Sequence, residues 1–396
     1  MGPLQGIRVV EFAGLGPGPF CGMMLADAGA DVVRIERPRP PGDGMSRLVL
    51  NPVLDRGKRS IALDLRDEAD REVVRRLLAR ADVLTEGFRP GVMERLGFGP
   101  EPVLAANPRL VYGRMTGWGQ SGPYARTAGH DIDYIAMTGA LHGFGRRGEL
   151  PTPPLNLLGD FGGGGMLLAF GLVAALLHAG RTGEGQVVDA AIVDGTALLT
   201  GMIHGLRIDG AWQDDRGVNL LDGGAPFYDV YACADGGFLA VGALEEPFYV
   251  ALITGLGLAE AELPHRSDPA QWPALRAVFA ARVAERSRAE WWEIFRGTDA
   301  CVAPVLDWAD AAADEHNVAR AVFTEVGGEL QPSPAPRFGT TAAEPPRPAP
   351  RLGESGAEIR AELDLPPAPL PGGFDVNRQE LGPERGGFDV NRQESR

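Results

Sequence analysis

Residues 6–38, GIRVVEFAGLGPGPFCGMMLADAGADVVRIERP, set the architecture from which the rest of the chain can be interpreted. Two β-branched runs, GIRVVEF and DVVRIERP, flank the segment PFCGMMLADAGA, which has helical character. A strand, a helix and a second strand in this order form a βαβ unit, whose two strands run parallel. We therefore expect the chain to begin with a parallel sheet.

The same alternation continues through the first half of the chain. It shows the run RSIALDL, the helical segment DEADREVVRRLLARA and the further runs DVLTEGF and RLVYGRMTGWG. Strands separated by helices of this length form a parallel sheet that helices cover on both faces. The predicted fold class is α/β, with a Rossmann-like large domain over residues 1–200.

The pattern changes after residue 200. Residues 225–244, APFYDVYACADGGFLAVGAL, contain two strands around an Ala-Asp-Gly-Gly turn, which predicts a hairpin. Helical segments follow, so we expect a smaller α+β domain over 222–310, with linkers at 201–221 and 311–329. Residues 366–396 carry GGFDVNRQE twice in a polar, Gly- and Pro-rich context and are predicted to be disordered.

Composition narrows the class of protein. The 396 residues carry a net charge of −15, which argues against a nucleic-acid surface. Cys21, Cys233 and Cys301 show no CxxC spacing, so neither a disulfide framework nor a metal site is expected. The amino terminus lacks a secretory signal, and the uncharged run 161–177 is short and glycine-rich, which favours a buried helix over a membrane span. We expect a cytoplasmic protein that does not bind a membrane.

The turn GLGPGP, residues 14–19, partly matches the glycine pattern of dinucleotide-binding proteins, and Glu36 stands near the position of their ribose-binding acid. However, Pro19 occupies the third glycine position, and Pro17 and Pro19 both remove backbone N–H donors. A rigid βα turn is therefore favoured over nicotinamide binding.

Asp160 is the only acidic or strongly basic residue in residues 156–180, NLLGDFGGGGMLLAFGLVAALLHAG. A buried carboxylate is costly unless it is paired or hydrogen-bonded. Two interpretations follow from this stretch alone. Asp160 is either the N-cap of the helix that follows or a catalytic carboxylate.

A histidine upstream offers a second functional group. His130 stands at the start of a predicted helix in TAGHDIDYIAMTGALHGFG. Single histidines are usually structural, and this interpretation is given to His142, His178, His204, His265 and His316.

Several motifs resemble those of one enzyme family. The segments GHDIDY, PLNLLGDFGGG, GQVVDAAIVDG, LDGGAPFYDVY and VGALEEPFY are similar to those of α-methylacyl-CoA racemases of the class III CoA-transferase superfamily. GIRVVEFAGLGPGPF and GTDACVAPVL share the resemblance, which spans residue 3 to about residue 360.

The resemblance implies that His130 and Asp160 are the two acid/base residues and that Glu245 partners the histidine. Because Glu246-Pro247 follows Glu245, where relatives commonly show Glu-Pro-Gln, either glutamate could face His130. A racemase removes a proton beside a thioester carbonyl on one face and returns one on the other, which two such groups can do. Free backbone N–H groups near 159–161 and at the helix start could stabilise the enolate oxygen, and the glycines could let the backbone and the thioester approach closely.

CoA is part of the implied substrate, and no separate cofactor is expected. The family's CoA contacts map onto Arg37, Ala62, Leu63, Asp64, Arg89, Gly129, Asp131 and Tyr134. Arg56, Lys58 and Arg59 form another basic island, which is interpreted as solvated surface or, alternatively, as a phosphate contact.

The resemblance also implies an interlocked homodimer, with the active site between one chain's large domain and its partner's small domain. We expect residues 330–362 to complete the large domain. Two alternatives to a racemase remain: a class III CoA-transferase with Asp160 as covalent nucleophile, and a non-catalytic CoA-binding protein. His130 favours the racemase, because a transferase needs no proton-transfer partner there.

Overall fold

The first half of the chain forms a six-stranded parallel sheet in the order β3-β2-β1-β4-β5-β6. The computed structural model describes residues 2–38, 51–341 and 344–367. The strands are β1 (Arg8–Phe12), β2 (Asp31–Glu36), β3 (Arg59–Ala62), β4 (Val83–Glu86), β5 (Val111–Thr116) and β6 (Val187–Ala191). This is the strand order of Rossmann-type sheets, so the predicted α/β fold class is confirmed.

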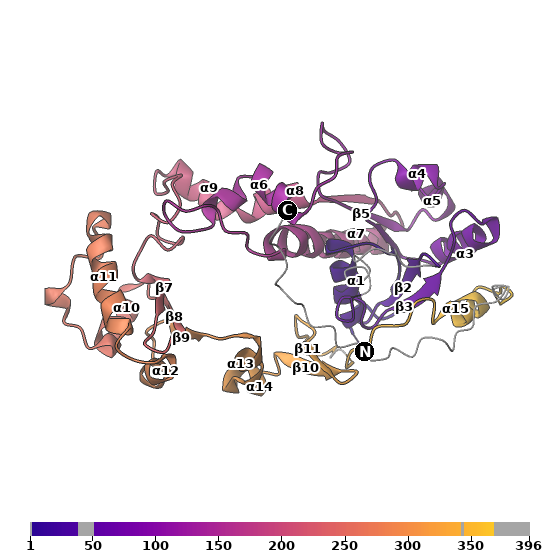
Figure 1. Cartoon of the computed structure of the whole chain (residues 1–396). Coiled ribbons are helices and arrows are strands. Elements are labelled where there is room, and N and C mark those ends of the chain that lie inside the picture. Colours follow the sequence, from indigo (N-terminus) through magenta and orange to yellow (C-terminus); the bar gives the residue numbers. More distant parts are fainter. Residues whose placement is uncertain (1, 39–50, 342–343, 368–396) are drawn as a thin grey trace, which may run out of the picture.

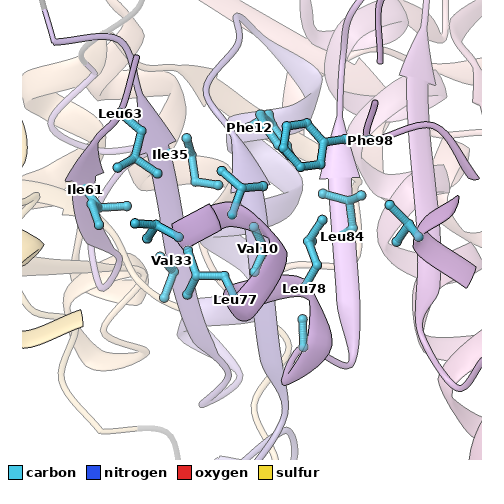
Figure 2. Packing of buried hydrophobic residues seen from close by; sticks show 14 of the residues in the cluster. Val10, Phe12, Val33, Ile35, Ile61, Leu63, Leu77, Leu78, Leu84 and Phe98 are labelled. Carbon is cyan, nitrogen blue, oxygen red and sulfur yellow. The ribbon is translucent and has the colours of Figure 1, made fainter. Parts of the chain in front are cut away.

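Helices cover both faces of this sheet because successive strand residues point to opposite sides. On one face, Val10, Phe12 and Val33 pack against α3 (Glu68–Ala79), as Figure 2 shows for Leu77 and Leu78. On the other face, the side chains of Val9 and Val32 pack in a second core. The helices that contribute most residues to this second core are α1 (Pro17–Asp27) and α7 (Leu167–Thr182), and Tyr134 and Ile192 add to it from α6 (Asp131–Met137) and α8 (Ile192–Leu199). Two short helices, α4 (Val92–Arg95) and α5 (Pro100–Ala106), lie between β4 and β5 in the chain.

A second lobe lies apart from the large sheet (Figure 1). Its antiparallel sheet has the order β7-β8-β9, with β7 (Tyr228–Ala232), β8 (Phe238–Gly242) and β9 (Val302–Val305). The helices α10 (Glu246–Leu256), α11 (Trp272–Val283) and α12 (Arg288–Phe295) pack with this sheet around a core of their own. The predicted hairpin and α+β lobe are therefore present, and the exact domain bounds stay a prediction.

After this lobe the chain returns to the large sheet. It passes through α13 (Trp308–Ala313), α14 (Glu315–Ala319), β10 (Phe323–Val326) and β11 (Glu329–Pro332) and ends in α15 (Gly356–Glu362) beside β3 (Figure 1). Most of the predicted disordered tail, residues 368–396, lies outside the described residues.

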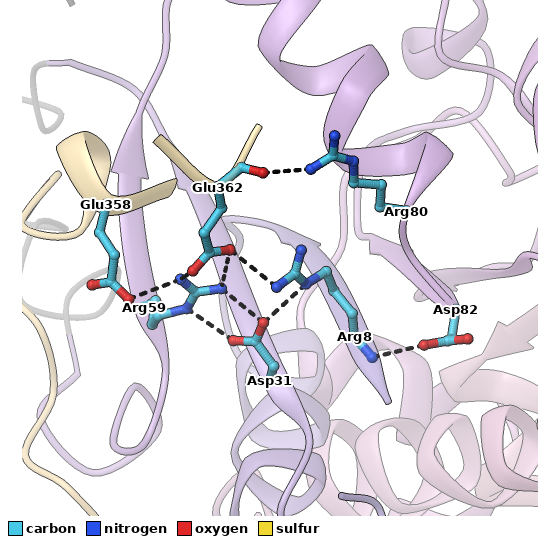
Figure 3. Close-up of polar contacts among 7 residues, drawn as sticks. All are labelled: Arg8, Asp31, Arg59, Arg80, Asp82, Glu358 and Glu362. Atoms are coloured by element: carbon cyan, nitrogen blue, oxygen red, sulfur yellow. Dashed lines mark hydrogen bonds and ion pairs between the residues drawn. The ribbon is translucent and has the colours of Figure 1, made fainter. Parts of the chain in front are cut away.

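Arg59 of β3 forms ion pairs that link α15 of this returning segment to the sheet (Figure 3). Its guanidinium donates to Asp31 at 2.7 and 2.8 Å and to Glu362 at 2.6 Å, and Arg8 binds the same two carboxylates at 2.9 and 3.0 Å. The interpretation of Arg59 as solvated surface or a phosphate contact is therefore wrong.

Lys58 and Arg56 are also buried in ion pairs. The Lys58 ammonium lies 2.9 Å from both Glu11 carboxylate oxygens and donates to the Pro19 carbonyl at 3.1 Å. Arg56 binds Asp27 at 2.5 Å. From sequence alone, basic residues are expected at the protein surface. Here Lys58 and Arg56 are buried because each is paired with a buried carboxylate.

Replacing Lys58 by Met is expected to lower the free energy of unfolding by about 3–5 kcal/mol, because Glu11 would stay buried without its cation. Urea denaturation measures this change. The control is Arg66→Met, which removes an exposed ion pair with Asp64 and should cost under about 1 kcal/mol. Equal effects of the two substitutions would contradict a structural role for the buried pair.

One helical segment among the described residues, Leu157–Thr182, is long and apolar enough to cross a membrane by length and composition alone. It contacts α1, α8 (Ile192–Leu199), β5 and β6 within the chain, but only 39% of its most apolar window is buried there. The expectation of a buried helix is thus right for one face only. The other face exposes Met166, Phe170, Val173 and Leu177.

Candidate functional site

Asp160 lies inside a π-helix, η2 (Leu157–Met166), which runs directly into α7. The helix begins after Asn156, whose carbonyl accepts the Phe161 N–H at 3.3 Å in the i→i+5 pattern of a π-helix. Asp160 is therefore not an N-cap, and the capping interpretation is wrong. Single π-helical turns occur frequently at functional sites.

The glycines that follow Asp160 serve helix packing. A Cβ on Gly195 of α8 would overlap the Gly163 carbonyl oxygen, and one on Gly164 or Gly165 would lie 2.9 Å from Pro17 or 2.6 Å from Phe20 of α1. Protein atoms thus fill the space beside Gly163–Gly165, which the sequence suggested would admit a thioester. The missing side chains let α1 and α8 pack closely against η2.

Asp131, the residue that follows His130 in the chain, joins the start of α6 to the part of η2 that carries Asp160. His130 is the N-cap of α6 (Asp131–Met137), and its backbone N–H donates to the Asp133 carboxylate at 2.9 Å. The Asp131 carboxylate accepts the Asp160 backbone N–H at 2.6 Å. The side chain of His130 is exposed and that of Asp160 is half-buried, so both can face a ligand.

The environment of Asp160 changes its acidity. Burial, together with the nearby Asp131 carboxylate, raises the pKa of Asp160 to about 6, although the hydrogen bond from the Asn156 amide at 3.3 Å and the proximity of His130 act in the opposite direction. Such a carboxyl group exchanges protons near neutral pH, as a general acid or base must.

Further predicted residues lie around this pair. The Tyr134 hydroxyl donates to the Gly129 carbonyl at 2.5 Å, and its ring packs edge-on against Trp118 with centroids 4.7 Å apart. Burial, Asp160 and Asp133 raise the pKa of Tyr134 to about 12, and Arg89 lowers it. Sequence reasoning missed Trp118 and Asn156; the only available signal for Trp118 was an aromatic residue close to the end of a predicted strand.

The remaining predicted CoA contacts lie along the carboxyl edge of the parallel sheet, where α/β proteins bind ligands. Arg37 is exposed directly after β2, and Arg89 is exposed after β4. Ala62 ends β3, and the Leu63 side chain is buried in the core, so only its backbone is available to a ligand. Asp64 pairs with Arg66 at 2.7 Å.

Glu245 lies elsewhere, at the N-cap of α10 in the small lobe. It is exposed, and in the described part of the chain no hydrogen bond or ion pair joins it to His130 or Asp160. Its neighbour Glu246 pairs with Arg266 at 3.4 Å. One chain therefore does not assemble the three predicted catalytic groups. The described residues also contain no cluster of His, Cys, Asp and Glu that could hold a metal ion.

Comparison with known proteins places this site in a family. The alpha-methylacyl-CoA racemases of Mus musculus and Homo sapiens are each 51% identical to this chain over 343 residues, which cover 86% of this chain and 88% of each relative. The crystal structure of a CAIB/BAIF family protein from Brucella suis superposes with a TM-score of 0.78 at 30% identity, covering 92% of this chain and all of that one. The model of CoA-transferase family III matches residues 4–356. The chain belongs to CoA-transferase family III.

Proposed function

We propose that this protein inverts the α-carbon of 2-methylacyl-CoA thioesters, with His130 and Asp160 as the two acid/base groups. The observation that carries the proposal is the placement of a half-buried carboxyl group with a pKa of about 6 beside an exposed histidine. The racemases from mouse and human, at 51% identity, support the same activity.

In this mechanism ionised Asp160 removes the proton from one face of the α-carbon. The C–H electron pair moves into the thioester to give an enolate, and a protonated His130 returns a proton to the other face. The opposite epimer uses the groups in reversed roles. Because only ionised Asp160 can act as the base, the direction that starts with Asp160 should slow as the pH falls below about 6.

The enolate oxygen needs hydrogen-bond donors. The Asp160 N–H is already bound by Asp131 and the Phe161 N–H by Asn156, so the expected donors near 159–161 are occupied. The first turn of α6 supplies the alternative, because the N–H groups of Asp131 and Ile132 precede the first intrahelical hydrogen bond.

We also propose that two chains interlock, so that the partner's Glu245 completes the site of each large domain. This assembly explains why His130 and Glu245 of one chain do not meet. It would also cover the exposed apolar residues of α7, α8 and α9 (Gly201–Ile208), which are Met166, Phe170, Val173, Leu177, Leu198, Leu199, Met202 and Ile208.

CoA would bind along the carboxyl edge of the sheet. Arg37 and Arg89 supply cations for its phosphates, and the backbone of 62–64 supports the adenosine. Gly129 and Tyr134 border the thioester end. No separate cofactor takes part in this reaction.

A class III CoA-transferase remains the second candidate, because the same carboxylate could form a covalent anhydride with an acyl group. The two activities separate when a 2-methylacyl-CoA is incubated in deuterated water without an acceptor acid. A racemase should incorporate deuterium at the α-carbon and lose stereopurity, as mass spectrometry and chiral analysis would report. CoA exchange that requires an added acid, without deuteration, would identify a transferase. Binding of CoA esters with neither reaction would identify a non-catalytic protein.

A further inference from the structure

Asp131 occupies a position that its expected role as a CoA contact does not explain. Its residue is 8% exposed, and its carboxylate faces the backbone of η2, where Oδ2 accepts the Asp160 N–H at 2.6 Å. The other oxygen, Oδ1, is buried without a hydrogen-bond partner. A buried carboxylate without a cation is costly, which points to a function for Asp131 at this position.

We propose that Asp131 is a positioning residue for Asp160: its buried carboxylate fixes the backbone of η2 at Asp160 and sets a second negative charge beside the Asp160 side chain, making Asp160 a stronger base. This inference rests on the proposed role of Asp160 as an acid/base group.

The contact between Asp131 and the backbone of η2 depends on the absence of a side chain at Gly159. A Cβ on Gly159 would overlap Asp131 Oδ2, so only glycine permits the carboxylate to reach the first turn of η2. Burial raises the pKa of Asp131, and hydrogen bonds from the backbone N–H groups of Asp160 and Gly159 oppose part of this rise. These backbone N–H groups thus offset part of the cost of burying the Asp131 carboxylate.

The charges around Asp160 leave Asp131 as its principal anionic neighbour. His130 and Asp131 act on it from the start of α6, and Gly16, the N-cap of α1, lies so close that a Cβ there would be 2.9 Å from the Asp160 carboxylate. The Tyr134 phenol also lies near Asp160, whose charge raises the pKa of Tyr134, but a phenol carries no charge near neutral pH. The other charged or titratable groups on α1, α6, α8 and the adjoining turn act elsewhere: Cys21 lies near Glu11 and Lys58, Asp27 pairs with Arg56, Asp194 acts on Asp189, Asp133 binds the His130 N–H, and His142 binds the Asp214 carbonyl. Two like charges in close proximity disfavour ionisation of both.

The test is Asp131→Asn, which keeps an oxygen to accept the Asp160 N–H but removes the charge. Carbon-13 NMR of labelled aspartate carboxyl groups, with the Asp160 signal assigned by comparison with Asp160→Asn, should show Asp160 titrating at lower pH in the variant. The acid limb of the pH–rate profile should move to lower pH only for the epimer that Asp160 deprotonates. The rate for that epimer should fall about three- to tenfold, since a weaker base accepts the proton less readily.

Asp133→Asn is the matched control, because it neutralises another carboxylate of α6 that binds His130 and not Asp160. It should leave the Asp160 titration in place. Gly159→Ala tests the positioning of the backbone separately from the charge. The new Cβ displaces the Asp131 carboxylate without removing its charge, and the rate for the same epimer should fall.

An unchanged Asp160 titration in Asp131→Asn, or an equal shift of the acid limb for both epimers, would overturn the inference. If Asp131→Asn fails to fold, Gly159→Ala provides the test, and unchanged rates for both epimers in that variant would overturn the inference. The NMR titration does not depend on turnover, so absence of α-deuteration in the wild-type protein would refute the proposed function and leave the role of Asp131 measurable.

Discussion

Asp160→Asn is expected to lower the rate of α-carbon inversion by at least about 10²-fold while the protein still folds and binds CoA esters. The amide cannot accept the α-proton, because it lacks the basic carboxylate whose pKa the site raises to about 6. It retains the size of the side chain, so the packing of η2 against α1 and α6 should persist. Chiral analysis of the product, with thermal unfolding and CoA-ester binding as controls, measures the effect.

His130→Ala should show the complementary pattern. Asp160 could still remove and return a proton on its own face, so one epimer should keep slow α-deuteration without inversion. In Asp160→Asn the other epimer should keep it. A fully active Asp160→Asn protein, or loss of exchange from the same epimer in both variants, would contradict the assignment of one group to each face.

Phe170→Glu is expected to separate the proposed dimer and to reduce activity by at least about 100-fold. Phe170 is 73% exposed on the apolar face of α7, and a charge there could not be buried against a partner chain without a cost of several kcal/mol. Light scattering measures the mass in solution. Phe170→Met is the control, because it keeps an apolar side chain and should remain dimeric and active.

The activity loss follows from the separation of His130 and Glu245 in one chain. Coexpression of a His130→Ala chain with a Glu245→Gln chain tests this directly. In the mixed dimer one site carries both substitutions and the other carries neither, so about half of the wild-type activity per dimer should return. No recovery above that of the single variants, or an active wild-type monomer, would contradict a shared site.

Local sequence patterns were sufficient to predict the strands and helices that position the site. The β-branched runs of β1, β2 and β4, the amphipathic α3 and the Ala-Asp-Gly-Gly hairpin between β7 and β8 all follow from residues close in the chain. Their burial periodicity is visible in the sequence because each strand and helix alternates its faces at a fixed spacing. The predicted helix start at His130 is confirmed for the same reason.

The helical segments expected after the hairpin include residues 273–295, and the structure divides this stretch into α11 and α12. The second helix has its own capping box, in which the Ser287 hydroxyl and the Glu290 carboxylate bind each other's backbone N–H. This signal was present in the sequence, and the apolar pattern on either side obscured it.

The sequence contained the parallel-sheet architecture, the family motifs and the candidacy of His130 and Asp160, because these depend on periodicity and on short local segments. Tertiary structure decided where the charges lie: Lys58 meets Glu11 across 47 positions, Arg59 meets Glu362 across 303, and Asp131 meets the Asp160 backbone across 29. Desolvation and pairing depend on neighbours that are distant in the chain, so a basic residue that local patterning places at the surface can instead be buried by a remote carboxylate.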